Sequence, residues 1–92
     1  MQPIITELDE RVVKAIEAGV SALDIMHGEL KILLVDAEQE LMDAQEIEVA
    51  NGYSDAMESM ERRYWEGQVD ALSYLYTLTY QLSFAEVERD KQ

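Results

Sequence analysis

Ile32–Glu61 reads ILLVDAEQELMDAQEIEVANGYSDAMESME, and this stretch decides the fold. It is thirty residues long, contains nine acidic residues, and has no lysine or arginine. Its first part also carries apolar residues at the spacing of an α-helix. The same segment must therefore supply part of a hydrophobic core and present a concentrated negative charge.

On a helix over residues 29–50, one apolar stripe spans about 100° of arc, and a set of carboxylates lies just beside it. The stripe consists of Leu30, Leu33, Leu34, Ala37, Leu41 and Ala44. The carboxylates are Glu29, Asp36, Glu40 and Asp43, with Glu46 following. A sparser apolar line lies beyond them: Ile32, Val35, Met42 and Val49. Lys31 is the only base in this helix, so the acids form either a solvated surface or a face that meets a positively charged partner.

The overall composition limits the classes of function. Ninety-two residues make one domain with a small core, and the absence of cysteine excludes disulfides. A net charge of −13 disfavours direct binding to nucleic acid or to an anionic membrane surface. No apolar run approaches the roughly 20 residues of a membrane span, and no signal peptide is visible. We therefore expect a cytoplasmic protein that does not bind membranes.

Three helices are predicted, over residues 7–27, 29–50 and 55–88. Thr6 is placed to cap the first helix. At Gly28 the chain either bends or runs on unbroken into one long helix, and of these we predict a kink or tight break. The Asn51–Gly52 pair indicates a turn, after which Ser54 offers a cap for the third helix.

The third segment contains a competing signal. Over residues 74–84, large apolar residues occupy every even position, and Thr77, Thr79, Gln81 and Ser83 lie between the last five of them, which is typical of a β-strand. No second strand is apparent to pair with it, and an isolated strand is not stable. We therefore predict a helix here.

Apolar residues cover more than one side of this third helix. One line comprises Met57, Met60, Tyr64, Ala71, Leu75, Leu78, Leu82 and Ala85. A second line comprises Trp65, Val69, Leu72, Tyr76, Tyr80 and Val87. The predicted fold is all-α, an antiparallel helical hairpin or a three-helix arrangement, completed by homo-oligomerisation because the helices are apolar on two sides.

Metal binding and catalysis are poorly supported. Asp24 and His27 lie one turn apart, but a carboxylate-bridged site needs two such pairs and further glutamates. No nucleophile elbow or phosphate loop is present, and a domain of this size rarely provides a desolvated carboxyl in a cleft. We expect a protein that is not an enzyme, with no cofactor and no metal site.

An aromatic cluster on the third helix suggests a second type of site: Tyr64, Trp65, Tyr74, Tyr76, Tyr80 and Phe84. Arg62 and Arg63 are adjacent bases beside Tyr64 and Trp65. These rings are typical of a core or an oligomer interface. Alternatively, the four residues could bind an anionic, stackable ligand such as a nucleotide.

The segment Arg63-Tyr64-Trp65-Glu66-Gly67-x-x-Asp70-Ala71-Leu72 resembles the R-Y-x-E-G-x-x-D-A-L stretch of many short phage-encoded proteins. With the size and acidity of the chain, this resemblance implies a phage accessory protein. Such proteins often inhibit host machinery, some by imitating nucleic acid and others by sequestering nucleotide signals. The resemblance assigns no functional residues.

Three hypotheses follow. The first is an acidic helical binding protein that inhibits a basic, nucleic-acid-binding partner by nucleic-acid mimicry, through Glu29, Asp36, Glu40, Asp43 and Glu46. The second is a homo-oligomer that binds a small anionic nucleotide-like ligand at Arg62, Arg63, Tyr64 and Trp65. The third is a structural assembly subunit.

Overall fold

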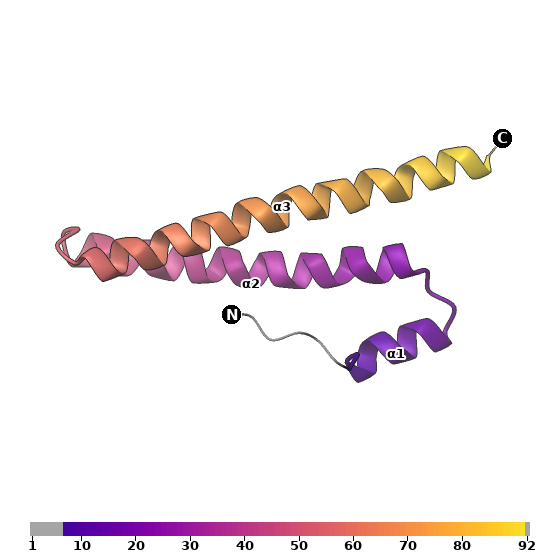
Figure 1. Cartoon of the computed structure of the whole chain (residues 1–92), viewed down its shortest axis with the longest axis horizontal. Coiled ribbons are helices and arrows are strands. Elements are labelled where there is room, and N and C mark those ends of the chain that lie inside the picture. The colour runs from indigo at the N-terminus through magenta and orange to yellow at the C-terminus, as the bar shows by residue number, and fades with distance from the viewer. Residues whose placement is uncertain (1–6, 92) are drawn as a thin grey trace.

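The computed structural model describes residues 7–91 and contains three helices, α1 (Glu10–Glu17), α2 (Ala22–Ala50) and α3 (Ala56–Asp90). The predicted all-α class is confirmed, and no strand occurs between residues 7 and 91. Residues 74–84 lie inside α3, so the helical interpretation of this alternating segment is correct. Figure 1 shows α2 and α3 as a long hairpin, with α1 beside α2.

The predicted break at Gly28 is wrong, because α2 runs through this residue without interruption. The break lies at Gly19, which has a φ of +87° and follows the C-cap of α1. The Val20 amide bonds the Ala15 carbonyl at 3.0 Å, as in a Schellman cap, where glycine accepts the left-handed conformation without a steric penalty. Ser21 then caps α2 by accepting a hydrogen bond from the Asp24 amide at 3.2 Å.

Helix α1 is shorter than the predicted helix over residues 7–27. Asp9 is the N-cap of α1, although its side chain makes no capping hydrogen bond. The predicted cap Thr6 lies outside the described residues. The segment predicted as one helix over residues 7–27 is thus divided between α1, a Gly19 turn and the start of α2.

The predicted turn at Asn51–Gly52 is confirmed. Gly52 and Tyr53 have φ values of 64° and 60°, which reverse the chain between α2 and α3. The N-cap of α3 is Asp55, whose carboxylate accepts a hydrogen bond from the Met57 amide at 2.9 Å. The predicted cap Ser54 is wrong, because its hydroxyl instead donates to the Asn51 carbonyl at 2.7 Å and closes the turn.

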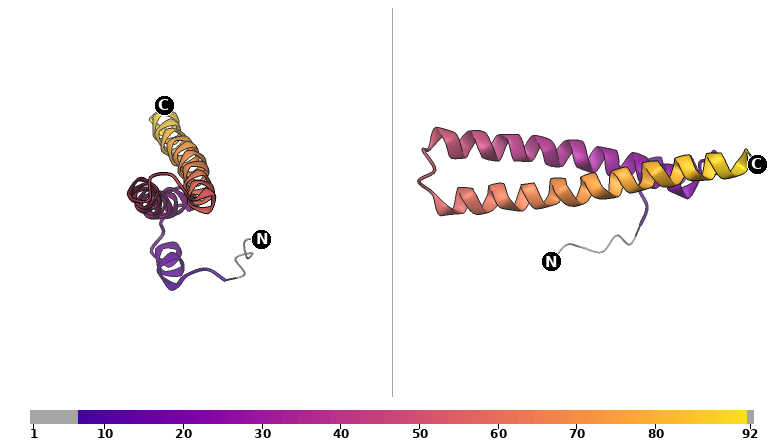
Figure 2. Two further views of the ribbon diagram at one scale, coloured as in Figure 1. Left: turned by 90° about the vertical axis from the view of Figure 1, so that its left-hand side faces the viewer. Right: turned by 90° about the horizontal axis from the view of Figure 1, so that it is seen from above.

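The two long helices pack along one antiparallel seam in which residues recur at alternating steps of four and three. This is the heptad spacing of a coiled coil, which keeps one line of side chains facing the neighbouring helix. The α2 seam is Leu23, His27, Leu30, Leu34, Ala37, Leu41, Ala44 and Glu48, all buried or half-buried. The α3 seam is Glu58, Arg62, Trp65, Val69, Leu72, Tyr76, Thr79 and Ser83, also buried or half-buried. Figure 2 shows the two helices side by side in both views.

The centre of the seam is apolar and both ends are polar. Near the turn, Glu48 meets Ser59 and Arg62; near the open end, Asp24 and His27 meet Ser83 and Thr79. Only Ala37, Ala44, Glu48 and Thr79 are buried among the described residues, so the core is thin. Of the predicted α2 stripe, Leu33 lies outside this core and is 51% exposed.

The two apolar lines of α3 have different surroundings. Trp65, Val69, Leu72 and Tyr76 of the second line face α2, whereas Tyr80 and Val87 are exposed. The first line, which we call the outer line, is exposed along its whole length: Met57, Met60, Tyr64, Ala71, Leu75, Leu78, Leu82 and Ala85. Gly67 shares this face by its helical position.

The short helix α1 lies on the side of α2 away from α3 (Figure 2). Between α1 and α2 is an open, mainly apolar hollow of about 1040 Å³ that includes Val12, Ile16, Val20, Ile25 and Met26. Within residues 7–91, no helix is both long enough and apolar enough to cross a membrane.

Candidate protein-binding site on α2

The carboxylates of Asp36, Glu40 and Asp43 form what we call the acidic ridge of α2. All three residues are exposed, and they follow one another by four and three positions on one continuous helix. Their positions therefore differ by about 6 Å and 4.5 Å along the helix axis. The Asp43 carboxylate accepts a hydrogen bond from the side-chain amide of Gln39 at 3.0 Å. Over residues 7–91, no lysine or arginine forms an ion pair with any of the three.

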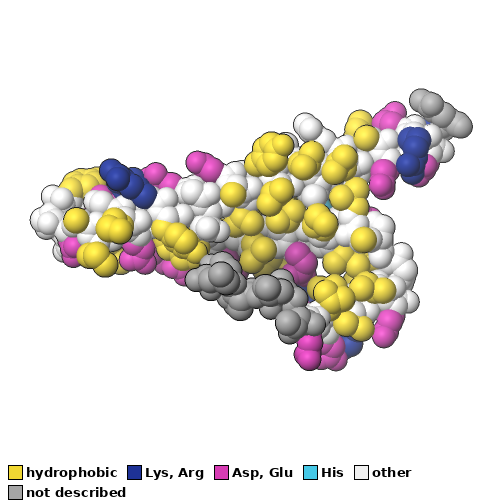
Figure 3. Space-filling view, in the orientation of Figure 1, with side chains coloured by type: hydrophobic (Ala, Val, Ile, Leu, Met, Phe, Trp, Pro, Cys, Tyr) yellow, Lys and Arg dark blue, Asp and Glu magenta, His cyan; other side chains and the backbone are white. Residues whose placement is uncertain are grey.

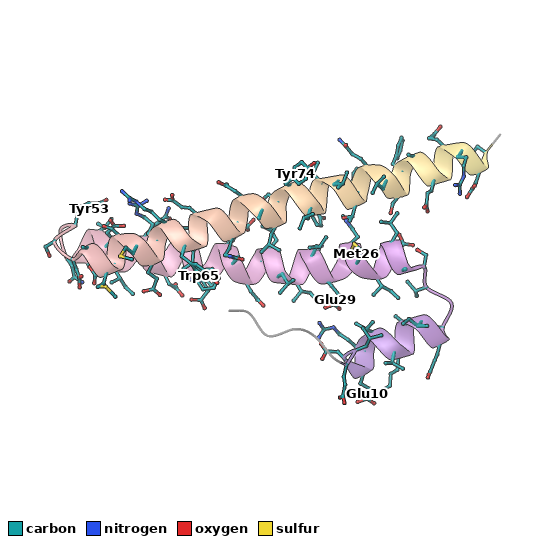
Figure 4. The ribbon with its side chains drawn as sticks, viewed as in Figure 1. Glu10, Met26, Glu29, Tyr53, Trp65 and Tyr74 are labelled. Carbon is teal, nitrogen blue, oxygen red and sulfur yellow. The ribbon has the colours of Figure 1, made fainter. Side chains whose placement is uncertain are left out.

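Glu29 was predicted to belong to the same surface, but its carboxylate has an intramolecular partner. The Arg11 guanidinium donates to both of its oxygens, at 2.9 and 2.5 Å, and joins α1 to α2. This hydrogen bonding lowers the pKa of Glu29 and raises that of Arg11. Figure 4 shows Glu29 on the side of α2 that faces α1. Glu29 therefore holds α1 in position, and the freely exposed carboxylates begin at Asp36.

Glu46 is exposed at the other end of the series. It follows Asp43 by three residues, and the helical rotation turns it toward the sparse apolar line of α2. There it borders a shallow apolar hollow with Met42 and Val49. Glu46 thus extends the negative surface toward the turn between α2 and α3.

A hollow of about 490 Å³ lies between α2 and α3 alongside the acidic ridge. Asp36 and Glu40 line it from α2, while Tyr64 and Trp65 line it from α3. The two rings meet edge to face, with centroids 5.0 Å apart. The fold thus joins two residues of one predicted site with two residues of the alternative site. Carboxylates beside aromatic rings suit a cationic group, because both attract positive charge.

The two arginines predicted for an anion site do not line this hollow. The Arg62 guanidinium donates to Glu48, and also to Glu66 at 2.5 Å, so two carboxylates already hold it. Arg63 is exposed on the surface of α3. The structure therefore brings Tyr64 and Trp65 together with acids, while the Arg62 guanidinium is bound to two carboxylates of its own.

Sequence reasoning missed the role of Glu48, which is 1% exposed. Its carboxylate accepts hydrogen bonds from the Ser59 hydroxyl, at 2.7 Å, and from Arg62. These bonds lower the pKa of Glu48 against the opposing effect of burial. The sequence does indicate this role, because Glu48 follows Leu41 and Ala44 at heptad spacing. That spacing places an acidic residue on the side of the helix that forms the core.

His27 also joins α2 to α3, a role that its position beside Gly28 did not indicate. Its Nδ1 lies 2.7 Å from the Thr79 hydroxyl, and its ring stacks on Tyr76 at 4.3 Å between centroids. The Thr79 hydroxyl donates its hydrogen to the Tyr76 carbonyl at 3.0 Å, so Nδ1 is the donor in the bond between His27 and Thr79. The nearby Asp24 accepts a hydrogen bond from Ser83 at 3.3 Å. Across the described part of the chain, no group of three or more His, Cys, Asp or Glu side chains is arranged to hold a metal ion.

No protein-family model matches this chain, and comparison with curated proteins and with solved structures yields no significant match. The candidate site is therefore defined by its own geometry: an exposed acidic ridge, a hollow lined by two rings, and a rigid helix that supports both.

Proposed function

We propose that this protein is a non-enzymatic binding protein whose acidic ridge occupies the basic, nucleic-acid-binding surface of another protein. The observation that carries this proposal is the exposure of Asp36, Glu40 and Asp43 on one helix, with no base paired to them within residues 7–91. Ordinary solvated helices intersperse both signs of charge, whereas this surface has one sign.

The spacing of the ridge is compatible with mimicry of a nucleic-acid backbone. Successive carboxylates lie a few ångströms apart along α2, which is comparable to the scale on which phosphates repeat along DNA. The net charge of −13 would accelerate encounter with a basic partner by long-range attraction. The neighbouring hollow with Tyr64 and Trp65 offers a place for an arginine or lysine side chain of that partner.

The resemblance of residues 63–72 to phage-encoded proteins favours one version of this proposal. In that version the protein acts in the host cytoplasm and inhibits a host or defence protein that binds nucleic acid. The acidic surface itself does not bind nucleic acid, because it has no bases with which to neutralise phosphates.

A charge-reversal experiment with a matched control tests the acidic ridge. One variant carries Asp36→Lys, Glu40→Lys and Asp43→Lys. The control carries Glu61→Lys, Asp70→Lys and Glu86→Lys, three exposed acids of α3 that form no ion pair or hydrogen bond in the structure, so the net charge changes equally. Circular dichroism verifies that both variants keep their helicity.

Each protein is used as bait in a host lysate at low and high salt, and captured proteins are challenged with duplex DNA. We expect the wild type and the control variant to capture a basic protein that DNA displaces and that high salt releases. The ridge variant should lose it. Retention by the ridge variant, or equal loss in the control, would reject the proposal.

The alternative function, sequestration of a small anionic nucleotide-like ligand, depends on Arg62, Arg63, Tyr64 and Trp65. Such a ligand would have to draw the Arg62 guanidinium away from Glu48 and Glu66. A thermal-shift screen against nucleotides tests it, and stabilisation that disappears with Arg63→Ala would favour it. The third function, an assembly subunit, draws on the exposed outer line of α3.

A further inference from the structure

The outer line of α3 is a long apolar surface that the hairpin does not cover. Its large side chains are between 37% and 70% exposed: Met57, Met60, Tyr64, Leu75, Leu78 and Leu82. Gly67 and Ala71 lie among them, and added atoms at Gly67 would meet nothing within 4 Å. Figure 3 shows hydrophobic side chains gathered over α3, and Figure 4 shows the flanking Tyr74 pointing away from α2.

The outer line carries no charged residue, although the chain has 20 acidic residues. Except where Tyr64 borders the hollow with Asp36 and Glu40, a basic partner would find no carboxylate on this line, so most of this surface does not suit the partner proposed for the acidic ridge. An uncharged apolar surface suits an equally uncharged apolar surface. A second copy of the same chain provides one.

The exposed area of the chain is larger than a monomer of its size requires. The structure exposes 7357 Å², whereas a compact monomer of 10.5 kDa exposes about 5,400 Å². Seven residues are not described by the structure. Removing them lowers the exposed area by at most about 1,150 Å² and the expected area to about 5,100 Å², which still leaves an excess of roughly 1,100 Å². That excess is sufficient for the area each partner contributes to a standard stable interface, about 800 Å².

The shape of the molecule agrees with this comparison. Its radius of gyration is 17.4 Å and its extents are 57 × 31 × 20 Å. A compact domain of this length has a radius of gyration of about 12 Å. A second hairpin laid along α3 would convert the thin hairpin into a four-helix bundle, which has a core of ordinary size.

The spacing of the outer line reads the same in both directions from Ala71. Steps of four, three, four and three residues lead from Ala71 to Leu75, Leu78, Leu82 and Ala85. The same steps in reverse lead to Gly67, Tyr64, Met60 and Met57. A two-fold interface between antiparallel helices needs this symmetry, because each residue meets its mirror position on the partner. Leu75 then lies opposite Gly67, so a large side chain meets a small one.

We propose that α3 pairs with α3 of a second copy, antiparallel, with Ala71 on the two-fold axis. Leu75 of each copy packs over Gly67 of the other, and Leu78 packs against Tyr64. The three carboxylates of the acidic ridge belong to α2 and lie outside this interface, which shares only Tyr64 with the neighbouring hollow, so either proposal can fail while the other holds. Because both copies carry a charge of −13, screening by salt strengthens this pairing, whereas salt weakens binding at the ridge.

Single cysteine variants test the axis, since the chain contains no cysteine of its own. Under mild oxidation, Ala71→Cys should form a disulfide-linked dimer. A residue on the two-fold axis lies close to the same residue of the second copy, within the distance that a disulfide spans. The matched control is Gln39→Cys, which is also at an exposed position but lies on α2. We expect the control to form no disulfide-linked dimer under the same conditions.

Sedimentation equilibrium at several salt concentrations measures the association directly. We expect the wild type to be a dimer at micromolar concentration, and Leu75→Lys with Leu78→Lys to be a helical monomer. The ridge variant with Asp36→Lys, Glu40→Lys and Asp43→Lys should still dimerise. A wild type that sediments as a monomer at micromolar concentration, or a dimer in which Ala71→Cys does not cross-link, would overturn the proposal.

Discussion

Glu48 of α2 and Arg62 of α3 form an ion pair across the hairpin beside the turn. The Glu48 side chain is 2% exposed and that of Arg62 is 25% exposed, so the carboxylate is shielded from water on nearly all sides. Ser59 and Glu66 complete the cluster, giving each charged group a second partner. The pair lies on the heptad seam, where most coiled coils place an apolar residue.

A double-substitution cycle should separate the attraction within this pair from the cost of burying it. Arg62→Leu alone leaves the Glu48 carboxylate buried without its counter-charge, so we expect a strong loss of thermal stability. The joint change Glu48→Leu and Arg62→Leu should recover much of that loss, because a packed apolar pair replaces a buried charge. Thermal unfolding of the wild type, the two single variants and the double variant measures these differences in stability. A double variant no more stable than Arg62→Leu would contradict this explanation.

The same carboxylate should make stability depend on pH. Hydrogen bonds from Ser59 and Arg62 hold the pKa of Glu48 below its ordinary value of 4.5. Because the folded state favours the charged form, this stabilisation is fully present above pH 4.5 and is lost as pH falls through the lowered pKa. The difference in unfolding free energy between wild type and Glu48→Gln should therefore shrink below pH 4.5. A difference independent of pH would exclude this effect.

The contact between His27 and Thr79 should contribute to the packing of the hairpin's open end. Thr79→Val keeps the side-chain shape but removes the oxygen that accepts the Nδ1 hydrogen of His27. A hydrogen bond lost at a half-buried position costs about 0.5–1.5 kcal/mol, and we expect a loss in that range. Chemical denaturation measures it. Thr77→Val, at an exposed position two residues earlier, should change stability by less than about 0.5 kcal/mol.

Replacing either of two glycines by alanine should change the stability of the protein, but in opposite directions. Gly28 lies in the interior of α2, and a Cβ there would meet nothing within 4 Å. Gly28→Ala should stabilise the protein by about 0.8–1 kcal/mol, because alanine loses less backbone entropy in a helix. Gly19 has a φ of +87°, where an alanine is strained, so Gly19→Ala should destabilise by about 1–2 kcal/mol. Denaturation midpoints compare the two, and destabilisation by Gly28→Ala would argue for a kink there.

Periodicity alone predicts three helical segments, and the Asn51–Gly52 pair predicts the reversal between the long ones. These features depend on neighbours within one or two turns, so the local pattern is sufficient. The break at Gly19 was also present locally, as a glycine followed by Ser21 and Asp24, but Gly28 offered a similar signal. The Schellman bond from Val20 to Ala15 distinguishes the two, and it exists only in the folded chain.

The amino-acid sequence by itself determined that this chain forms amphipathic helices and concentrates its negative charge on the middle one. Only the tertiary structure decided which apolar line of α3 faces α2, because both lines satisfy the same helical period. The choice depends on the register between helices, which buries Glu48 against Arg62, joins His27 to Thr79, and brings Trp65 beside Asp36. Those contacts link residues from 14 to 52 positions apart, so no local pattern encodes them.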